Sequence, residues 1–440
     1  MTRLHVNTAR APHRLSASEA AQAIATGRLT AEDLVRDCLN RIADRESVVR
    51  AWAALDADGA IAQARACDAG PRRGILHGIP IGVKDVLNTT GLPTQMGSPI
   101  YANHRTRNDA SCVALLRAAG AIVVGKTVTC EFAGVAPGLT TNPHDAARTP
   151  GGSSSGSAAA VADAMVPIAL GTQTGGSVLR PASFCGVIGY KPTYGLFNRE
   201  GLKFAAESLD TIGLFARELD DIALVAAVLT GQEPVAPKQP TGPLRIGLCH
   251  TYLWETKASP ETRTCIEAAA HAFERAGAQV ETFKLPDHFE QLTQAREIIN
   301  DVERARSLAW EWTWHRDQLS PQLIGTIERG LATPDKTYRS ALLFAERARS
   351  EMDAKLSEFD GLLAPCVNGE APLGLAYAGD PAFQGLWTLL HTPTIALPAC
   401  RGPNQMPVAL QLVARRGADE KLIALARWAQ EAAEIGMNLR

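Results

Sequence analysis

The 440-residue sequence lacks several features that would place it in a specialised class. Its net charge of −2 gives no reason to expect nucleic acid or an anionic membrane as a partner. No run approaches the roughly 20 apolar residues of a membrane span, and the first 18 residues hold no apolar core of a secretory signal. We therefore expect a cytoplasmic protein that does not associate with membranes.

Cysteine pairs and metal-ligand spacings are also absent. The nine cysteines are scattered, and no two of them form a C-x-x-C motif. An odd, dispersed set in a long chain predicts reduced thiols. The zinc pattern H-E-x-x-H does not occur. We expect neither a metal nor another cofactor.

One motif that is present is misleading. Residues 120–127, GAIVVGKT, match the P-loop pattern G-x-x-x-x-G-K-[ST] letter for letter. A P-loop needs a strand before its first glycine and a helix that starts at the lysine. Here a predicted helix (109–119) comes first, and the middle residues themselves read as a strand. The context therefore argues against nucleotide binding.

The most informative stretch is residues 149–181, in which glycine and serine occur side by side twice. The first cluster is 151–156 (GGSSSG) and the second is 174–177 (TGGS); a short buried helix and a strand (168–172) are predicted between them. Glycine lets the backbone adopt positive φ and direct N–H groups at a ligand, which suits a hydroxyl nucleophile beside an oxyanion hole.

Two other interpretations of the first cluster exist. A Gly/Ser run is often a flexible linker, but the alanine-rich flanks indicate burial. The segment from Gly152 to Gly156 also matches G-x-S-x-G, the nucleophile elbow of α/β-hydrolases. That elbow must follow a buried strand, whereas residues 142–150 are polar and contain two prolines.

Lys84 lies at the end of a predicted strand (76–87). Strand alternation places it on one face and Asp85 on the other. Burial would disfavour the charged form of this lysine, whereas a lysine at a strand end can also extend its ammonium to water. The residues alone leave both readings open.

Elsewhere the sequence predicts alternating elements. A βαβ unit at 244–283 predicts parallel strands, and the proline-rich segment 233–242 is the best internal boundary. Trp310 and Trp314 share one helix face, which favours packing in the core over a substrate wall. The other elements predicted are helices at 15–25, 30–43, 60–69, 218–230, most of 289–359 and 420–433, and strands at 361–365, 394–398 and 408–413.

Three consecutive motifs, GGSSSGSAAAVA, GTQTGGS and RPASFCGVIGYKPTYG, closely resemble the signature of the amidase signature family. The resemblance extends from about Leu15 to the last helix. It implies an α/β fold with a large, mixed, partly parallel sheet covered by helices on both faces. It also implies one domain over residues 1–440, with the core signature at 76–215 and a variable helical region at 289–359 that lines the substrate cleft.

The resemblance assigns a Ser-Ser-Lys triad. Ser177 matches the nucleophile, Lys84 the base and Ser153 the bridging serine, which the family holds by a cis peptide bond after Gly152. The amine of Lys84 would take a proton from Ser153, which takes the proton of Ser177. The backbone N–H groups that would form the oxyanion hole belong to Thr174, Gly175, Gly176 and Ser177.

Other assignments are less specific. Ser154 and Ser155 either hold the lysine amine or only form the turn, and Thr127 lies in a loop (127–131) expected to touch substrate. Two positions depart from many relatives: Gln173 replaces an aspartate, and Arg180 lies three residues after Ser177. Arg180 either contacts a substrate carboxylate or forms a structural ion pair.

The resemblance thus implies a serine-dependent amidohydrolase. It would cleave a C–N bond of a small carboxamide, or of a carbamate or ureido compound, through an acyl-enzyme, and the resemblance allows a homodimer. One alternative is an amidotransferase-type subunit that delivers ammonia to a partner working on RNA-bound substrate. Another is an α/β-hydrolase-like esterase, for which His391 would be the candidate base.

Overall fold

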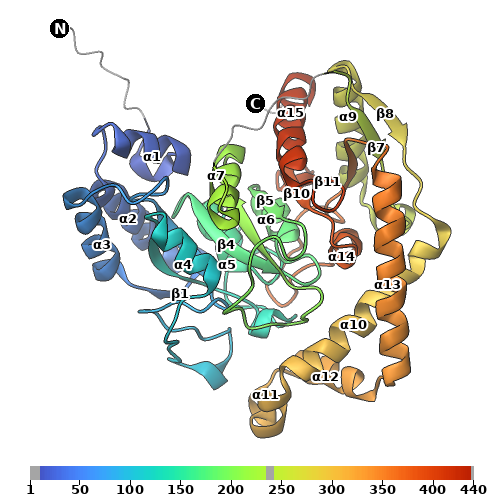
Figure 1. The fold of residues 1–440 in the computed structure, drawn as a ribbon, viewed down its shortest axis with the longest axis horizontal. Helices are drawn as coiled ribbons and strands as arrows, with labels where there is room; N and C mark the ends of the chain where they lie inside the picture. The colour runs from blue at the N-terminus through green and yellow to red at the C-terminus, as the bar shows by residue number, and fades with distance from the viewer. Residues whose placement is uncertain (1–9, 234–241, 438–440) are drawn as a thin grey trace.

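The computed structural model describes residues 10–233 and 242–437 and contains a large β-sheet surrounded by helices (Figure 1). The expected proline-rich connection at 233–242 lies almost wholly outside the described residues. The strands are β1 (Trp52–Leu55), β2 (Pro80–Lys84), β3 (Ile122–Thr127), β4 (Ile168–Gln173), β5 (Ile188–Lys191), β6 (Thr211–Ala216), β7 (Arg245–Leu248), β8 (Gln279–Thr282), β9 (Gly361–Pro365), β10 (Thr394–Arg401) and β11 (Pro407–Val413).

Most of the α-helices lie between these strands along the chain, and α10 to α13 follow one another without a strand between them. They are α1 (Ala17–Ala25), α2 (Ala31–Val49), α3 (Ala57–Ala69), α4 (Ser111–Ala118), α5 (Ser155–Ala162), α6 (Leu179–Cys185), α7 (Leu219–Thr230), α8 (Trp254–Lys257), α9 (Pro260–Arg275), α10 (Leu292–Ser307), α11 (Ala309–Trp314), α12 (Pro321–Ala332), α13 (Asp335–Leu356), α14 (Ala382–Leu389) and α15 (Asp419–Met437). None of the helices in the described residues is long and apolar enough to cross a membrane.

The sheet has eleven strands in the order β1-β3-β2-β4-β6-β5-β10-β11-β9-β7-β8. Strand β2 pairs in parallel with β3 and β4, and β7 pairs in parallel with β8 and β9. The remaining pairings are antiparallel. The predicted mixed, partly parallel sheet is therefore confirmed, as is the predicted βαβ unit, which is β7–α9–β8.

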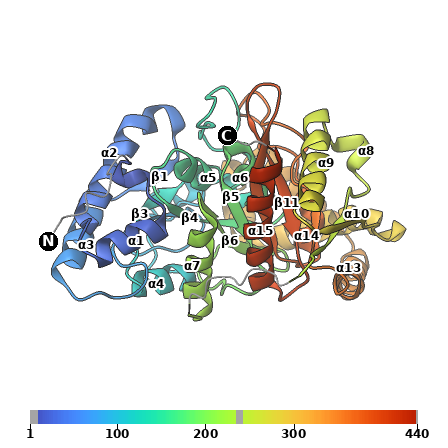
Figure 2. The ribbon, with the colours of Figure 1, turned by 90° about the horizontal axis from the view of Figure 1, so that it is seen from above.

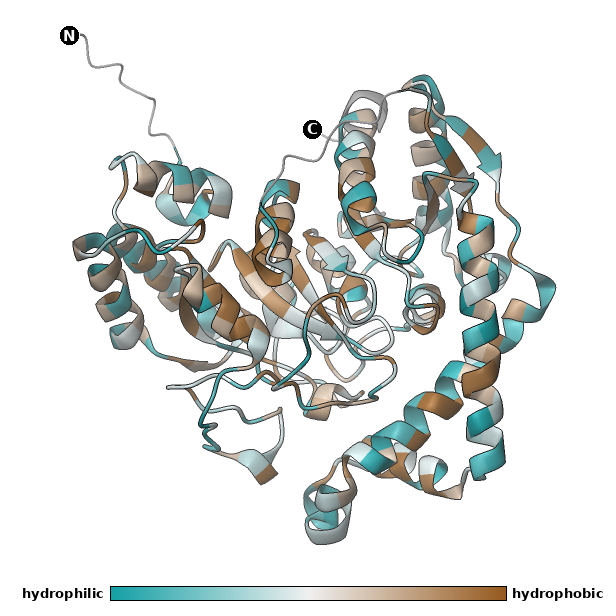
Figure 3. Cartoon of the chain, in the orientation of Figure 1, coloured by the Kyte–Doolittle hydropathy of each residue, from teal (hydrophilic) through white to brown (hydrophobic). Residues whose placement is uncertain are grey.

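Helices pack on both faces of this sheet. The view in Figure 2 shows α5 and α6 on one side of the central strands and α7 on the other, where α7 packs against α1, α4 and α15. Every residue of β2, β4 and β6 is buried. Strands covered on both faces carry apolar residues on both faces, as Ile168, Ala169 and Leu170 do in β4; Figure 3 shows brown over part of the central strands.

Helix α5 approaches the sheet closely because its sequence, SGSAAAVA, contains only small side chains and one valine. Gly156 lies in its first turn. A Cβ atom at this position would collide with the backbone oxygen of Ala51 and the backbone nitrogen of Val128. The alanine-rich composition thus brings the first serine cluster against β2 and β4.

Helices α10 to α13 form an arm that extends from the sheet (Figure 1). The long helix α13 alternates polar and apolar residues (Figure 3). The prediction that Trp310 and Trp314 pack in the core is wrong: they are 50% and 70% exposed on α11, near the end of the arm. The i, i+4 spacing placed them on one face correctly, but it does not tell whether another element covers that face.

The false P-loop lies within a strand. Residues from Ile122 to Thr127 form β3, so Gly125 and Lys126 are part of a pleated strand and no helix begins at the lysine. Lys126 is fully buried. The rejection of nucleotide binding on sequence context agrees with this placement.

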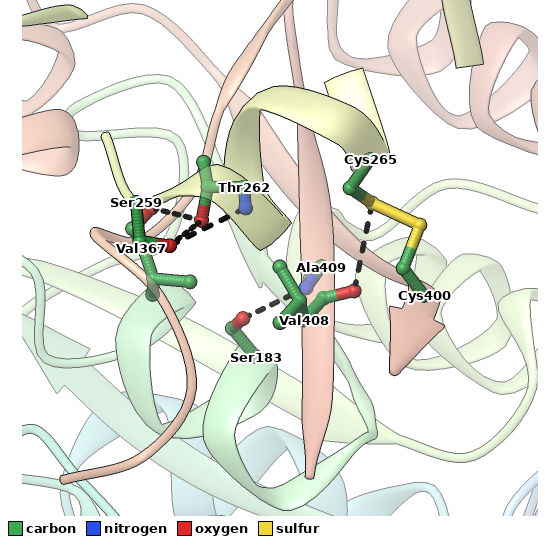
Figure 4. The surroundings of a disulfide bond; sticks show 8 residues. All are labelled: Ser183, Ser259, Thr262, Cys265, Val367, Cys400, Val408 and Ala409. Carbon is green, nitrogen blue, oxygen red and sulfur yellow. Dashed lines mark hydrogen bonds between the residues drawn. A yellow bond between two sulfur atoms is a disulfide. The ribbon is translucent and has the colours of Figure 1, made fainter. Parts of the chain in front are cut away.

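A disulfide joins Cys265 on α9 to Cys400 on β10 (Figure 4). The expectation that all cysteines are reduced is therefore wrong for this pair, although the other seven are free and buried. The two partners lie 135 residues apart in sequence, and only the packing of α9 over β10 brings them together. Both also line a pocket of about 790 Å³ between α9 and residues 400–403.

This disulfide generates a stability prediction. Closing a loop of 135 residues removes chain entropy from the unfolded state by an amount equivalent to about 5 kcal/mol in the loop-closure model. We expect the Cys265→Ser/Cys400→Ser variant to lose up to about this much unfolding free energy in urea titrations. An unchanged urea midpoint, with a non-reducing peptide map that lacks the linked pair, would contradict the assignment.

Candidate active site

Lys84 ends strand β2, which lies between β3 and β4. Its side chain is fully buried. The Nζ atom lies 2.7 Å from Ser153 Oγ, 2.7 Å from Thr172 Oγ1 and 3.3 Å from the backbone oxygen of Thr172. The structure thus places two of the residues picked out from the sequence, Lys84 and Ser153, in hydrogen-bond contact.

The environment of Lys84 favours its uncharged form. Among the described residues it forms no ion pair with a carboxylate. Burial lowers the pKa of Lys84 from 10.5 to about 7; the nearby Cys130 and Asp210 oppose this change in part, and the Arg304 guanidinium adds to it. Because desolvation disfavours the charged amine, Lys84 can accept a proton near neutral pH.

Thr172 is a site residue that sequence reasoning missed. Its hydroxyl and its carbonyl oxygen both accept from Lys84. Ser154 Oγ donates to the carbonyl oxygen of Thr172 at 3.1 Å and accepts from its backbone N–H at 3.2 Å. Ser154 therefore holds Thr172, which in turn holds the amine. A hydroxyl near the end of an otherwise apolar strand was the signal available in the sequence.

Ser153 follows a turn made by two glycines. Gly151 and Gly152 have φ values of +82° and +49°, the left-handed region that glycine adopts without strain. The expected cis peptide bond before Ser153 is not found, since every peptide bond in the described part of the chain is trans. The two glycine torsions make the turn instead. Hydrogen bonds from Gly152 N to Ala378 O (2.9 Å) and from Cys130 N to Ser153 O (3.1 Å) fix it.

Ser177 lies in the turn between β4 and α6 and is 7% exposed. A Cβ atom on Gly152 would lie only 3.0 Å from the Cα of Ser177, so the two serine clusters pack directly against each other. Within the described residues the Ser177 hydroxyl forms no hydrogen bond with Ser153. The structure brings Ser177 beside the Lys84–Ser153 pair without linking it to that pair.

The backbone around Ser177 has unused donors. Among the described residues, the N–H groups of Thr174, Gly175, Gly176 and Ser177 donate to no protein acceptor. A residue outside the turn fixes its position, because Thr174 Oγ1 donates to Asp210 Oδ1 at 2.5 Å. Asp210 directly precedes β6, and its other carboxylate oxygen accepts from the N–H of Ala205 at 2.6 Å.

Gln173 performs an acceptor role at the start of α6. Its Oε1 accepts from Val178 N at 2.9 Å and from Leu179 N at 3.1 Å, which satisfies donors that the helix itself leaves unpaired. Its Nε2 donates to Thr388 Oγ1 at 3.0 Å. An aspartate could supply the acceptor but not this donor. The glutamine thus keeps the helix start and adds a link to α14.

Arg180 is 6% exposed and forms no ion pair with a carboxylate among the described residues. Its Nε donates to Ala378 O at 2.7 Å, whereas its buried Nη1 has no hydrogen-bond partner. A Cβ atom on Gly176 would lie 2.8 Å from that Nη1. The structure therefore does not contain the structural ion pair considered from the sequence, and it places an unpartnered guanidinium nitrogen beside the serine turn.

Three other residues predicted from the sequence are Thr127, Ser155 and His391. Thr127 is fully buried, and its hydroxyl is 2.6 Å from Ser157 Oγ, so this hydroxyl is engaged within the core. Ser155 Oγ is buried without a partner. His391 stacks on Tyr194 at 3.9 Å, and its Nε2 lies 2.8 Å from the Ser208 oxygen. Burial lowers the pKa of His391 to about 3.

No metal site is evident in the part of the chain that the structure describes, because no group of three or more His, Cys, Asp or Glu side chains is arranged to hold an ion. The groups that these residues bring to the site are the lysine amine, the serine and threonine hydroxyls and the free backbone donors.

Known proteins resemble this chain in sequence and in fold. The model of the Amidase family matches residues 33–423. The A subunit of glutamyl-tRNA(Gln) amidotransferase from Chloroflexus aggregans (strain MD-66 / DSM 9485) is 35% identical, with 92% of this chain and 93% of that protein covered. A solved amidase is 32% identical with a TM-score of 0.88, covering 95% of this chain and 100% of that one.

A second solved structure comes from a vestigial protein complex related to the origins of an s-triazine catabolic enzyme. It is 27% identical with a TM-score of 0.86, and the alignment covers 95% of this chain and 98% of that one. The family match, the relatives and the eleven-stranded fold agree. The chain belongs to the amidase family and is a hydrolase that acts on carbon–nitrogen bonds other than peptide bonds.

Proposed function

We propose that the protein is a serine amidohydrolase that cleaves the C–N bond of a small carboxamide, or of a related carbamate or ureido compound, through an acyl-enzyme. Ser177 is the nucleophile, Ser153 the bridging hydroxyl and Lys84 the base. The observation that carries the proposal is a fully buried lysine amine 2.7 Å from a serine hydroxyl and without a carboxylate partner.

The hydrogen bonds of Lys84 support its role as a base. A neutral amine has two N–H donors and one lone pair, whereas the ammonium has three donors and no acceptor. The hydroxyl and the carbonyl oxygen of Thr172 take two donors. The third hydrogen-bonding direction of the Lys84 Nζ atom points to Ser153 Oγ. In the neutral form, the lone pair therefore faces the hydroxyl whose proton it must take.

The proton then follows a two-step path. Lys84 takes the proton of Ser153, and Ser153 takes the proton of Ser177 as the Ser177 oxygen attacks the carbonyl carbon. We propose that the hydrogen bond between the two serines forms when substrate binds, because catalytic hydrogen bonds often tighten only in that complex. The same path in reverse protonates the leaving nitrogen.

The unpaired backbone donors from Thr174 to Ser177 are proposed to stabilise the oxyanion of the tetrahedral intermediate. Loss of one such donor commonly lowers the rate by about 10²–10³. Arg180 is proposed to contact the substrate through its free Nη1, which lies beside Gly176. Ser154 acts through Thr172, and Ser155 has a free hydroxyl that can serve the substrate side.

A second candidate function follows from the relatives. Proteins 33–35% identical to this chain are A subunits of glutamyl-tRNA(Gln) amidotransferases, and an amidotransferase-type subunit would use the same site to release ammonia for a partner. Copurification of a partner and RNA-dependent activity would support it. Turnover of small amides by the isolated chain supports the hydrolase. A panel of amides, carbamates and ureas tests this directly.

Replacement of the proposed triad residues gives the first test of mechanism. We expect Ser177→Ala to abolish turnover and Lys84→Ala to lower kcat/KM by about 10²–10⁴-fold, the usual contribution of a positioned base. Circular dichroism checks that both variants fold. An active Lys84→Ala protein together with an inactive His391→Ala protein would support the esterase alternative.

The pH dependence gives a second test. Since the base works only when uncharged, and the pKa of Lys84 lies at about 7, the protonated and inactive form dominates below that pH. We expect kcat/KM to fall about tenfold per pH unit below about 7 and to level off above it. A rate that is flat from about pH 5 to about pH 9 would argue against a lysine base.

Thr172 offers a test with a close control. Thr172→Val removes the hydroxyl that accepts from Lys84 but keeps the side-chain shape. We expect kcat to fall about tenfold, the equivalent of one hydrogen bond that no longer orients the amine. Thr172→Ser keeps the hydroxyl and should stay within about threefold of the natural enzyme. Equal activity of the two variants would show that the hydroxyl does not orient Lys84.

A further inference from the structure

Two lysines on adjacent strands are fully buried, but only one of them has a carboxylate partner. Lys84 ends β2, and Lys126 lies on the parallel neighbour β3. The Nζ of Lys126 is 3.3 Å from Asp85 Oδ1, and Asp85 is 1% exposed. In the register of the two strands, Lys126 is paired with Val83, and Lys84 is paired with Thr127. The two lysines therefore point to opposite faces of the sheet.

Lys126 holds the turn that directly follows Lys84. Besides the ion pair, its Nζ donates to Leu87 O at 2.6 Å and to Thr94 Oγ1 at 2.7 Å. The turn is tight, since Lys84 O accepts from Val86 N at 2.8 Å and from Leu87 N at 3.0 Å. All three donors of a charged ammonium are thus engaged, and one of them holds the turn itself.

Asp85 ties the same turn to a neighbouring segment. Both of its carboxylate oxygens lie 3.1 Å from Gln95 N, and its backbone oxygen accepts from Met96 N at 2.9 Å. Phe132 N donates to Met96 O at 2.8 Å. Met96 and Phe132 belong to the apolar cluster that residues of α10 and α12 complete. The ion pair therefore links the end of β2 to the part of the helical arm beside α11.

We propose that the Asp85–Lys126 ion pair is a positioning device for Lys84: it fixes the turn after β2 so that the amine stays within hydrogen-bond reach of Ser153. This inference rests on the proposed function. The pair acts through the backbone, because its side chains lie on the opposite face from the amine. Its two charges compensate each other, so it holds the turn without giving Lys84 a counter-ion.

The test uses covalent labelling of Ser177, which needs no knowledge of the substrate. With an alkyl fluorophosphonate, the Ser177 oxygen forms a P–O bond, the P–F bond breaks, fluoride leaves, and the serine proton passes to the relay. Mass spectrometry locates the label, and its second-order rate measures how well the serine is activated. Rates are compared at about pH 8, where the amine of Lys84 is mostly uncharged, and at a temperature at which each variant is folded.

We expect Asp85→Asn and Lys126→Met each to label about 10–100-fold more slowly, the effect of moving a catalytic group by about 1 Å. A single replacement leaves a buried charge unpaired and lowers stability. The double variant removes both charges and should regain stability while it still labels slowly, because a methionine in place of Lys126 has no donor for the Leu87 oxygen. Should the single variants not fold, the double variant decides the question alone.

A matched control removes another buried carboxylate. Asp221 accepts the N–H groups of Ala17 and Ser18 at the start of α1, and Asp221→Asn should lower stability without slowing the labelling. No labelling of Ser177 in the natural protein would overturn the proposed function. Labelling of the natural protein, combined with a double variant that labels at the same rate, would overturn only the positioning role.

Discussion

The arrangement of the whole site depends on one buried amine that has no carboxylate partner. A lysine taken out of water loses the solvation of its charge, so the protein either supplies a counter-ion or shifts the amine to its neutral form. At Lys84 the second outcome holds, and burial brings its pKa to about 7. At Lys126, on the neighbouring strand, Asp85 supplies the counter-ion. Burial also lowers the pKa of Lys126, to about 8, and the charge of Asp85 opposes that change.

The surrounding structure makes this burial possible. Strand β2 lies inside the sheet, where β3 and β4 satisfy its backbone on both sides. The small residues of α5 bring the first serine cluster over the end of the strand. Hydroxyls and carbonyls, rather than carboxylates, then surround the amine. None of these three contacts supplies the negative charge of a carboxylate, which would stabilise the protonated amine.

The sequence predicted much of the fold around Lys84 because its strongest signals come from short stretches of neighbouring residues. Hydrophobic runs and glycine–serine clusters identified β2, β4 and α5, and the family resemblance pointed to Lys84, Ser153 and Ser177. The features it missed depend on tertiary placement. The disulfide pairs cysteines 135 residues apart. Thr172 belongs to the site because its position on β4 brings its hydroxyl within hydrogen-bond distance of Lys84. Trp310 and Trp314 lie on a helix face that no other element covers fully.

The position of the proposed reactive groups along the chain has a consequence for divergence. Lys84 ends β2, Ser153 precedes α5, Thr172 lies on β4 and Ser177 follows β4, all in the first half of the chain. The second half contributes supports such as Ala378 and Thr388, together with the helical arm. Exposed positions of the arm, such as Trp314, can therefore change without replacing a residue of the proposed proton path. Such a division allows the proposed reaction centre to be retained while a separate region of the chain diverges.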